Sequence, residues 1–342
     1  MKLFKILSVV FTMLLTLPFV SLANADEKLK VGFIYVGPVG DHGWTYMHDQ
    51  GRLLVESELG DKVTTTYIEN VKYGPDAERV IRDMAQTGHD IIFATSFGYM
   101  ESMLKVAKEF PDVKFEHATG YKTAPNMSVY SSKFYQGRYI QGVIAGHMSK
   151  NGKAGYIASF PIPEVIRGIN AFWAGATSVN PDFDIDVVWV NTWYDPAKEA
   201  DAAKVLISQG VDIITQHTDS PAALQIAEME GILGFGQASD MIQFAPKAQL
   251  TAIIDDWGPY YVKRVQAVID GTWETSDTWG GMDTGMVKMA EYTNMPSTLA
   301  TIAEELQTLI TTGELDPFGG QFTTGELLGM TDYLPGIDAI KP

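Results

Sequence analysis

The sequence predicts an α/β protein with two doubly wound lobes, each built on a parallel sheet. Short apolar runs of strand length alternate with amphipathic runs of helix length along the chain. The apolar runs have little polar alternation, which is typical of parallel strands covered by helices on both faces. The alternation restarts near residue 153, and 342 residues is the length of about two ordinary domains.

The first 25 residues are predicted to be a signal peptide rather than part of the fold. Two lysines give a basic start, residues 6–20 form an apolar run, and residues 23–25 (Ala-Asn-Ala) have the small side chains of a cleavage site. The mature chain should then begin at Asp26 and be exported. An uncleaved membrane anchor is the alternative, but the apolar run is short for a membrane span.

Composition excludes several classes of function. The formal net charge is −17, and removal of Lys2 and Lys5 with the signal peptide takes it to −19. Such a charge argues against nucleic acid or an anionic membrane surface as a partner. The chain has no cysteine, which excludes disulfides, thiol catalysis, cysteine-based metal sites and a lipid-modified cysteine.

The first predicted strand and the loop after it carry the most distinctive residues. Residues 31–36 form an apolar run, glycine and proline break regular structure over 37–43, and a helix is predicted from Trp44 to Glu58. Ligands of open α/β sheets bind beyond the carboxyl ends of the strands, so Asp41 and Trp44 lie where a ligand is expected. The structural alternative keeps Trp44 in the core and makes Asp41 a helix cap.

The same loop argues against two other kinds of site. It has neither G-x-G-x-x-G nor G-x-x-x-x-G-K-[ST], so no phosphate-binding loop is predicted. His42 and His48 occur without a cysteine or an H-E-x-x-H motif, so no metal site is predicted. An aromatic ring beside a hydrogen-bond acceptor suits instead a flat, nitrogen-rich ligand.

Strands and helices then alternate up to about residue 149. The predicted strands are 62–69, 90–96, 114–119 and 128–134, and the predicted helices are 75–87, 97–110 and 135–149. Pro75 and Gly88 mark the start and the end of the first of these helices. Gly142 and Gly146 predict that the last helix packs closely against a neighbour.

The alternation restarts at Lys153 and continues to the last predicted helix. The predicted strands are 153–159, 186–191, 212–217, 232–237 and 249–255, and the predicted helices are 163–179, 196–209, 222–230, 259–269 and 296–312. The two halves share this alternation but no strong sequence repeat. The sequence therefore predicts a second lobe with the architecture of the first.

Aromatic and polar residues follow the strand ends in both halves. Besides Asp41 and Trp44, the candidate ligand-binding residues are Phe97, Phe160, Glu164, Trp193, Asp219 and Asp240. Two lobes facing each other would bring these loops together, where aromatic rings hold a planar ligand and carboxylates accept its N–H groups. Structural alternatives stay open: Asp219 also suits a helix cap, and Glu164 suits the dipole of a helix N-terminus.

Several segments together resemble one protein family. They are residues 31–52, 94–99 (ATSFGY), 134–146, 195–196 and 234–240. Through them the whole mature chain is similar to the BMP family ("basic membrane proteins"), the substrate-binding proteins of bacterial ABC importers. The known ligands of that family are largely purine nucleosides and bases.

The resemblance implies a type I periplasmic binding-protein fold, with several chain crossings between lobes that close on a ligand. Lobe 1 is then expected to hold residues 26–148 and 249–278, and lobe 2 residues 149–248 and 279–342. Many family members are lipoproteins, but this chain lacks cysteine. We therefore expect a monomer free in a periplasm, with no cofactor and with an ABC permease as its partner.

The first loop also bears on the ligand. In nucleoside-binding members this loop is similar to Asp-x-Ser-Phe-Asn, and its aromatic residue stacks on the base. The matching positions here are Asp41, Gly43, Trp44 and Thr45, so the stacking ring is kept while Ser and Asn are missing. Asp240 is the nearest match to the acidic residue that holds ribose hydroxyls. The resemblance thus implies a purine ligand, and the changed loop favours a free base such as adenine over a nucleoside.

Other functions stay open at this point. A binding protein for riboflavin or a sugar would use the same fold. An exported nucleoside hydrolase would need a nucleophile or an acid–base pair, but G-x-S-x-G and H-E-x-x-H are absent and the six histidines are scattered. No enzymatic activity is therefore expected. A sensory binding protein would use the same closed state as an importer component, and the sequence does not distinguish the two.

Overall fold

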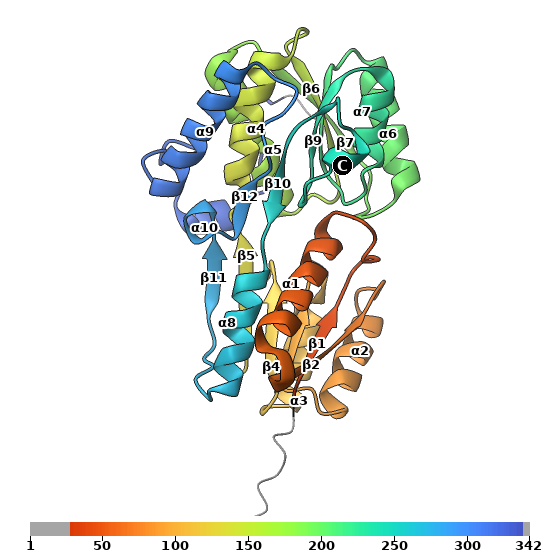
Figure 1. Ribbon diagram of the computed structural model, residues 1–342, viewed down its shortest axis with the longest axis vertical. Helices are drawn as coiled ribbons and strands as arrows, with labels where there is room; N and C mark the ends of the chain where they lie inside the picture. The colour runs from red at the N-terminus through yellow and green to blue at the C-terminus, as the bar shows by residue number, and fades with distance from the viewer. Residues whose placement is uncertain (1–27, 338–342) are drawn as a thin grey trace, which may run out of the picture.

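The computed structural model describes residues 28–337, which fold as two lobes, one above the other in Figure 1. The predicted signal peptide at residues 1–25 lies outside the described residues. Each lobe has one six-stranded sheet with helices on both faces. The predicted fold class, two doubly wound α/β lobes joined by several crossings, is confirmed.

Lobe 1 has the strand order β11-β5-β4-β3-β1-β2, and all its strands are parallel. The strands are β1 (Leu29–Ile34), β2 (Val63–Ile68), β3 (Ile91–Ala94), β4 (Lys114–Ala118), β5 (Met127–Ser132) and β11 (Asp277–Gly280). The helices are α1 (Trp44–Leu59), α2 (Pro75–Gln86), α3 (Met100–Glu109) and α8 (Gly258–Ile269). Two 3-10 turns, η1 (Gly60–Lys62) and η2 (Phe97–Tyr99), follow α1 and precede α3.

Alternate residues of β1 belong to two different cores. Val31 and Phe33 lie in the core under α1 and α8, whereas Ile34 lies in the core under α2 and α3. All three side chains are fully buried. A strand buried on both faces needs apolar residues at consecutive positions, which is why β1 reads as a continuous apolar run.

Lobe 2 has the strand order β12-β10-β9-β8-β6-β7, and only β12 is antiparallel to its neighbour. The strands are β6 (Lys153–Ala158), β7 (Asp184–Trp189), β8 (Ile213–His217), β9 (Leu233–Gly236), β10 (Gln249–Asp255) and β12 (Val287–Met289). The helices are α4 (Tyr135–Met148), α5 (Pro163–Val179), α6 (Pro196–Ser208), α7 (Ala222–Glu230), α9 (Ser297–Thr312) and α10 (Thr324–Leu328). Two 3-10 turns, η3 (Ile242–Phe244) and η4 (Met282–Thr284), precede β10 and β12.

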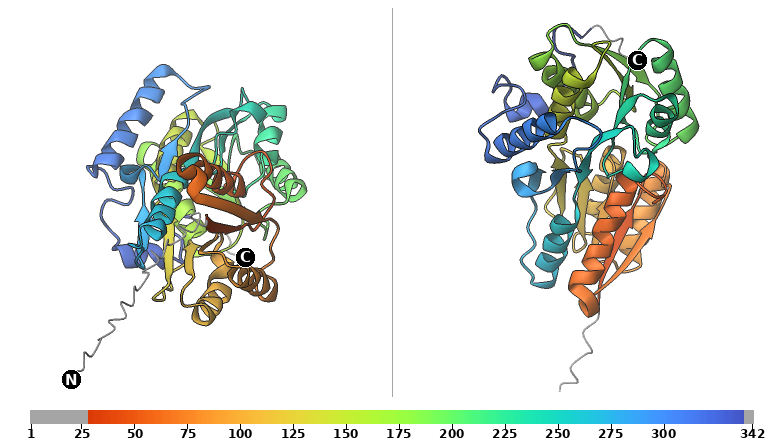
Figure 2. Two further views of the ribbon diagram at one scale, coloured as in Figure 1. Left: turned by 60° about the horizontal axis from the view of Figure 1, so that its bottom comes forward. Right: turned by 45° about the horizontal axis from the view of Figure 1, so that its top comes forward.

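Within residues 28–337 the chain crosses between the lobes three times, after β5, after β10 and after β11. Figure 2 shows α8 and β11 beside the strands of lobe 1, far along the chain from them. A buried ion pair fixes this return, because Arg264 Nε of α8 donates to Glu116 Oε1 of β4 at 2.6 Å. We propose on this basis that α8 belongs to lobe 1.

Two elements lie in a different lobe from the one expected. Residues 249–255 are expected in lobe 1, but β10 pairs with β9 and β12, and its Leu250 and Ile253 are buried in the core of lobe 2. The helix within 135–149 is also expected in lobe 1, but α4 packs on α5. An apolar strand or helix does not reveal which of two similar cores it completes. We propose lobe limits of 28–132 with 256–280, and 133–255 with 281–337.

The glycines of α4 explain its tight packing. A Cβ atom at Gly142 would lie 2.0 Å from the carbonyl oxygen of Phe172, and one at Gly146 would lie 2.6 Å from that of Ala176. The predicted close packing of this helix against a neighbour is thus confirmed, and the neighbour is α5. In residues 28–337, no helix is long and apolar enough to cross a membrane.

Candidate ligand-binding site

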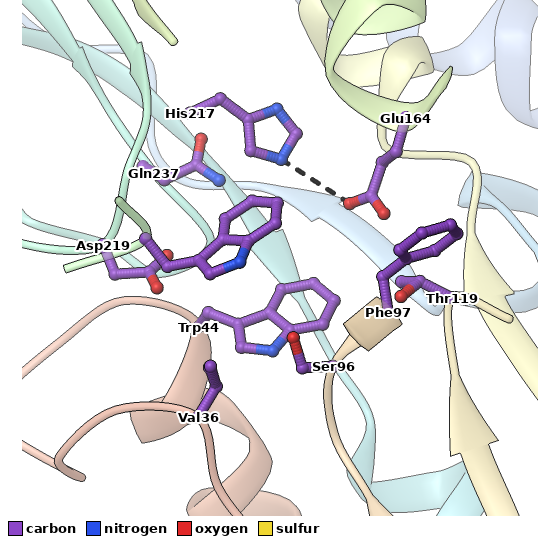
Figure 3. Close-up of a pocket in the computed structure, with 10 residues that line it drawn as sticks. Val36, Trp44, Ser96, Phe97, Thr119, Glu164, His217, Asp219 and Gln237 are labelled. Atoms are coloured by element: carbon purple, nitrogen blue, oxygen red, sulfur yellow. Dashed lines mark ion pairs between the residues drawn. The ribbon is translucent and has the colours of Figure 1, made fainter. Parts of the chain in front are cut away.

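The carboxyl ends of the parallel strands in the two lobes face each other across a thin slot (Figure 3). Lobe 1 contributes Val36, Trp44, Ser96, Phe97 and Thr119, and lobe 2 contributes Glu164, Trp193, His217, Asp219 and Gln237. The cavity volume of the slot is about 20 Å³. Because a single water needs roughly 10–15 Å³ on this scale, the walls of the slot lie close together.

Trp44 begins helix α1 and is held in one orientation. Its Nε1 donates to the backbone oxygen of Thr95 at 2.7 Å. Its ring lies edge-to-face with the rings of His48 and Trp257, with centroids 4.6 and 5.4 Å apart. The N–H edge of the indole is therefore occupied by the protein, which leaves the ring itself as the part that a ligand can contact.

Trp193 lies in the loop between β7 and α6 and faces the slot from lobe 2. The hydroxyl of Tyr73 is hydrogen-bonded to the Trp193 side chain and, at 2.7 Å, to Ser96 Oγ. Tyr73 thereby connects Trp193 to lobe 1. Burial raises the pKa of Tyr73 to about 12, so this hydroxyl stays neutral. The ring of Phe160 packs against that of Trp193, with centroids 5.3 Å apart.

Glu164 and His217 lie in contact on the lobe 2 side of the slot. Glu164 stands in the first turn of α5, His217 ends β8, and their Oε1 and Nε2 atoms are 3.5 Å apart (Figure 3). Burial lowers the pKa of His217, and the nearby carboxylate of Glu164 opposes that shift. The imidazole is therefore neutral at pH 7, and the carboxylate keeps capacity to accept further hydrogen bonds.

Asp219 connects the two lobes. It is almost fully buried, and its carboxylate accepts a hydrogen bond from the backbone N–H of Trp44. Burial raises the pKa of this carboxyl well above its usual range, and the charge of Glu199 adds to the effect. The side chain thus joins the first turn of α1 to the loop after β8.

Further contacts between the lobes involve the glycine-rich loop before α1. The backbone N–H of Gly43 donates to Ser239 Oγ at 2.8 Å, and His42 lies 3.2 Å from Gln243 Nε2. Gly43 has φ +98°, and a Cβ atom there would lie 2.2 Å from the backbone oxygen of Asp219. Only glycine permits this close approach, so the loop is shaped for contact with lobe 2.

The structure brings Trp44, Phe97, Glu164, Trp193 and Asp219 of the predicted site together around the slot. It does not bring the other three candidates there. Asp41 is exposed, and Phe160 lies against Trp193 in a neighbouring hollow. Asp240 accepts hydrogen bonds from the Ile242 backbone N–H at 3.0 Å and from Gln249 Nε2 at 2.7 Å, so it holds its own loop.

Five slot residues are not among the eight candidates although they also lie at or just after strand ends. They are Val36, Ser96, Thr119, His217 and Gln237. The strand-end rule points to these positions, but their side chains are common in cores and loops. Gln237 illustrates why they are missed, since its Oε1 accepts from the fully buried Arg138, a contact with no sequence signal. Among residues 28–337 no cluster of His, Cys, Asp or Glu side chains could hold a metal ion.

Comparison with known proteins identifies the family. Residues 28–312 match the Bmp family, described as ABC transporter substrate-binding protein PnrA-like. The chain belongs to this family. The family consists of substrate-binding proteins rather than enzymes, and its members act outside the cytoplasm.

Two relatives of this Bmp-family chain have names that state a ligand. A purine-binding protein of Brucella abortus (strain 2308) is 60% identical over 335 residues, covering 94% of this chain and 96% of that protein. A Haloferax volcanii protein, provisionally named an ABC transporter glucose-binding protein, is 38% identical over 325 residues, covering 93% of this chain and 83% of that protein.

Solved structures agree on the fold of this Bmp-family chain. A solute-binding protein of an ABC transporter system from Aeropyrum pernix K1 superposes with TM-score 0.75 at 18% identity, covering 87% of this chain and 97% of that one. A similar protein from Conexibacter woesei DSM 14684 gives TM-score 0.67 at 22% identity, covering 84% and 98%. These likenesses support the predicted type I binding-protein fold and nothing finer.

Proposed function

We propose that this protein binds a purine between its two lobes and delivers it to an ABC permease, and that it prefers a free base such as adenine to a nucleoside. The observation that carries the proposal is the thin slot, into which Trp44 and Trp193 are directed from opposite lobes. A slot this thin accommodates a flat ring better than a bulky or branched molecule. The 60% identical purine-binding relative supports the same ligand class.

The polar groups of the slot suit the edge of a purine. The Glu164 carboxylate would accept an N–H group of the ring or of the exocyclic amine. The Gln237 amide N–H groups can donate to a ring nitrogen while its Oε1 accepts from Arg138. The Ser96 hydroxyl, which also bonds to Tyr73, can donate or accept. A ligand without these groups would leave buried polar atoms unpaired, which costs about 1–3 kcal/mol for each group.

The preference for a base over a nucleoside rests on two features. The slot has little volume to spare. Asp240, the residue expected to hold ribose hydroxyls, is instead engaged with Gln249 and the backbone of its own loop. A ribose would therefore have to lie outside the thin slot, and it would need hydrogen-bond partners that the slot residues do not supply.

A sugar is the second candidate, because the Haloferax relative is named as glucose-binding. Sugars also stack on tryptophan, yet they carry hydroxyls all round and are thicker than a purine. The slot has two carboxyl groups, those of Glu164 and Asp219, and the Asp219 carboxyl already accepts a hydrogen bond from the Trp44 backbone N–H. Few carboxylate oxygens therefore remain to bind the hydroxyls of a sugar, which favours the purine.

The remaining parts of the proposal concern the setting. Residues 1–25 are removed as a signal peptide, and the mature protein works as a monomer in a periplasm. Ligand contacts to both lobes would stabilise the closed form, and the permease would recognise that form. No bond is made or broken in this cycle.

A thermal-shift screen tests the proposal. The mature protein is unfolded and refolded to remove carried-over ligand, and then tested with purine bases, their nucleosides, riboflavin, glucose and other simple sugars. A ligand at 100 times its Kd should stabilise the fold by about 2.7 kcal/mol, which is a visible rise in Tm. A rise with bases and little with nucleosides is expected. A rise with nucleosides alone would overturn the preference for a base, and no rise with any purine would overturn the purine.

A further inference from the structure

A second and much wider cavity opens directly off the slot. It shares Phe97, Thr119 and Glu164 with the slot, and its cavity volume is about 400 Å³. Its other walls come from both lobes and include Tyr121 of lobe 1 and Leu328 at the end of α10. We call this space the side chamber. Because it adjoins the slot at three residues, a ligand seated in the slot can extend into it.

The side chamber presents exposed apolar side chains from opposite lobes. Tyr121 is 64% exposed and Leu328 is 39% exposed. One exposed apolar residue would be ordinary on a protein surface, but two on the walls of one cavity form a patch. Covering them with an apolar group is favourable by roughly 25 cal/mol per Å² removed from water.

Two of the polar residues at the side chamber, Arg167 and Thr119, already bond to the protein. Arg167 is nearly fully buried, its Nη1 donates to the Leu327 backbone oxygen at 2.6 Å, and its guanidinium lies over the Trp279 ring. The hydroxyl of Thr119 donates to the Ala118 backbone oxygen at 2.7 Å. These two groups are poorly placed to receive the hydroxyls of a sugar, and the apolar side chains on the chamber walls favour an apolar occupant.

We infer that the protein also takes purines that carry an apolar substituent on the exocyclic amine, with the ring in the slot and the substituent in the side chamber. This inference rests on the proposed purine function. Glu164 stands where the two spaces meet. A secondary amine keeps one N–H group, so the Glu164 carboxylate can accept it while the substituent points away past Phe97. A benzyl group or a branched five-carbon chain is small enough for the chamber.

Calorimetric titration of the refolded mature protein tests the inference. The probes are adenine, N6-benzyladenine and adenosine. Burial of the benzyl group against Tyr121 and Leu328 should make N6-benzyladenine bind about tenfold more tightly than adenine. If adenine binds and N6-benzyladenine binds at least tenfold more weakly than adenine, the inference is overturned and the purine function stands. If neither binds, both are overturned.

Two variants distinguish binding of the substituent in the side chamber from a general effect of an added charge on affinity. Leu328→Glu places a charge at the chamber wall and should cancel the gain from the benzyl group while leaving the affinity for adenine unchanged. Met229→Glu is the matched control, because Met229 is an apolar residue of α7 that is 78% exposed and is not part of either cavity. It should change neither affinity. A Leu328→Glu protein that still favours N6-benzyladenine tenfold would place the substituent elsewhere and contradict the inference.

Discussion

Trp44 is the residue on which the proposed ligand contact depends most. Its N–H is bonded to Thr95 and its ring edge is packed by His48 and Trp257, so the indole is already ordered before a ligand arrives. A pre-ordered ring does not lose side-chain entropy on binding. Stacking on it should therefore contribute nearly its full value.

Replacement of Trp44 measures this contribution. Trp44→Ala should weaken adenine binding by about 1–3 kcal/mol, roughly 5- to 150-fold in Kd. Trp44→Phe keeps an aromatic ring and should lose only part of that affinity. Isothermal titration of the refolded variants gives the Kd values. Unchanged affinity together with a lower Tm would show that Trp44 is only a core residue.

Asp219 makes the closed form sensitive to pH. Its pKa is raised in the structure, chiefly by burial, above the ordinary value of 3.8. The folded protein therefore holds this proton more tightly than the unfolded chain, and its stability should fall as pH rises from about 4 through the raised pKa. Asparagine does not titrate, but its side-chain oxygen still accepts from the Trp44 backbone N–H.

Thermal unfolding of Asp219→Asn across pH tests this linkage. The variant and the parent protein should have similar Tm values near pH 4, and the variant should be the more stable at pH 8. The direction follows from the cost of burying an unpaired charge, which only the parent protein bears. A Tm difference that does not change with pH would show that this carboxyl has the same pKa in the folded and unfolded chains.

The candidate site could be predicted from sequence only in part, for a reason that lies in single side chains. The strand-end rule locates loops, and five of the eight candidate residues line the slot. Whether a loop side chain points inward depends on contacts made elsewhere. Asp240 turns to Gln249 and Asp41 turns to solvent, and neither direction leaves a mark in the sequence.

Among the elements, the loop between β1 and α1 governs contact between the lobes. Gly43→Ala would strain a left-handed residue and push a Cβ atom against the Asp219 backbone oxygen. We expect it to weaken adenine binding at least tenfold, because the lobes could not close fully. Its strain cost is of order 1–3 kcal/mol, so Tm should also fall.

A matched variant separates strain from crowding. Gly60, at the other end of α1, has φ +52°, but a Cβ atom added there would meet no other atom within 4 Å. Gly60→Ala should lower Tm in a similar way and leave the affinity for adenine unchanged. Titration and thermal unfolding of both variants check this. Equal losses of affinity would show that backbone strain, and not contact with Asp219, explains the effect.

The positions of helices and strands along the chain could be predicted because both lobes alternate apolar strands with amphipathic helices. The lobe to which an element belongs could not be predicted in this way. The strand 249–255 has the same limits in the sequence prediction and in the structure. Its partners, β9 and β12, are set by which core accepts Leu250 and Ile253. The short β11 and β12 were not predicted as strands, since four and three residues carry too little periodicity.

At the scale of the whole molecule, the three crossings form the expected hinge, and the contacts of Gly43 and His42 with lobe 2 stabilise closure. Without a ligand, closure rests on contacts between the lobes alone, whereas a bound purine adds contacts to both lobes. The ligand-free protein should therefore be more open on average. Small-angle scattering should show a smaller radius of gyration at saturating adenine, and an unchanged radius would mean that binding does not close the lobes.

The most direct test of purine binding between the lobes is a crystal structure of the refolded protein with adenine. The account predicts one adenine in the slot, its ring in contact with Trp44 and Trp193 and its edge bonded to Glu164. It also predicts that Asp41 and Asp240 make no contact with the ligand. Adenine bound outside the slot, or crystals that hold none at saturating concentration, would contradict the account.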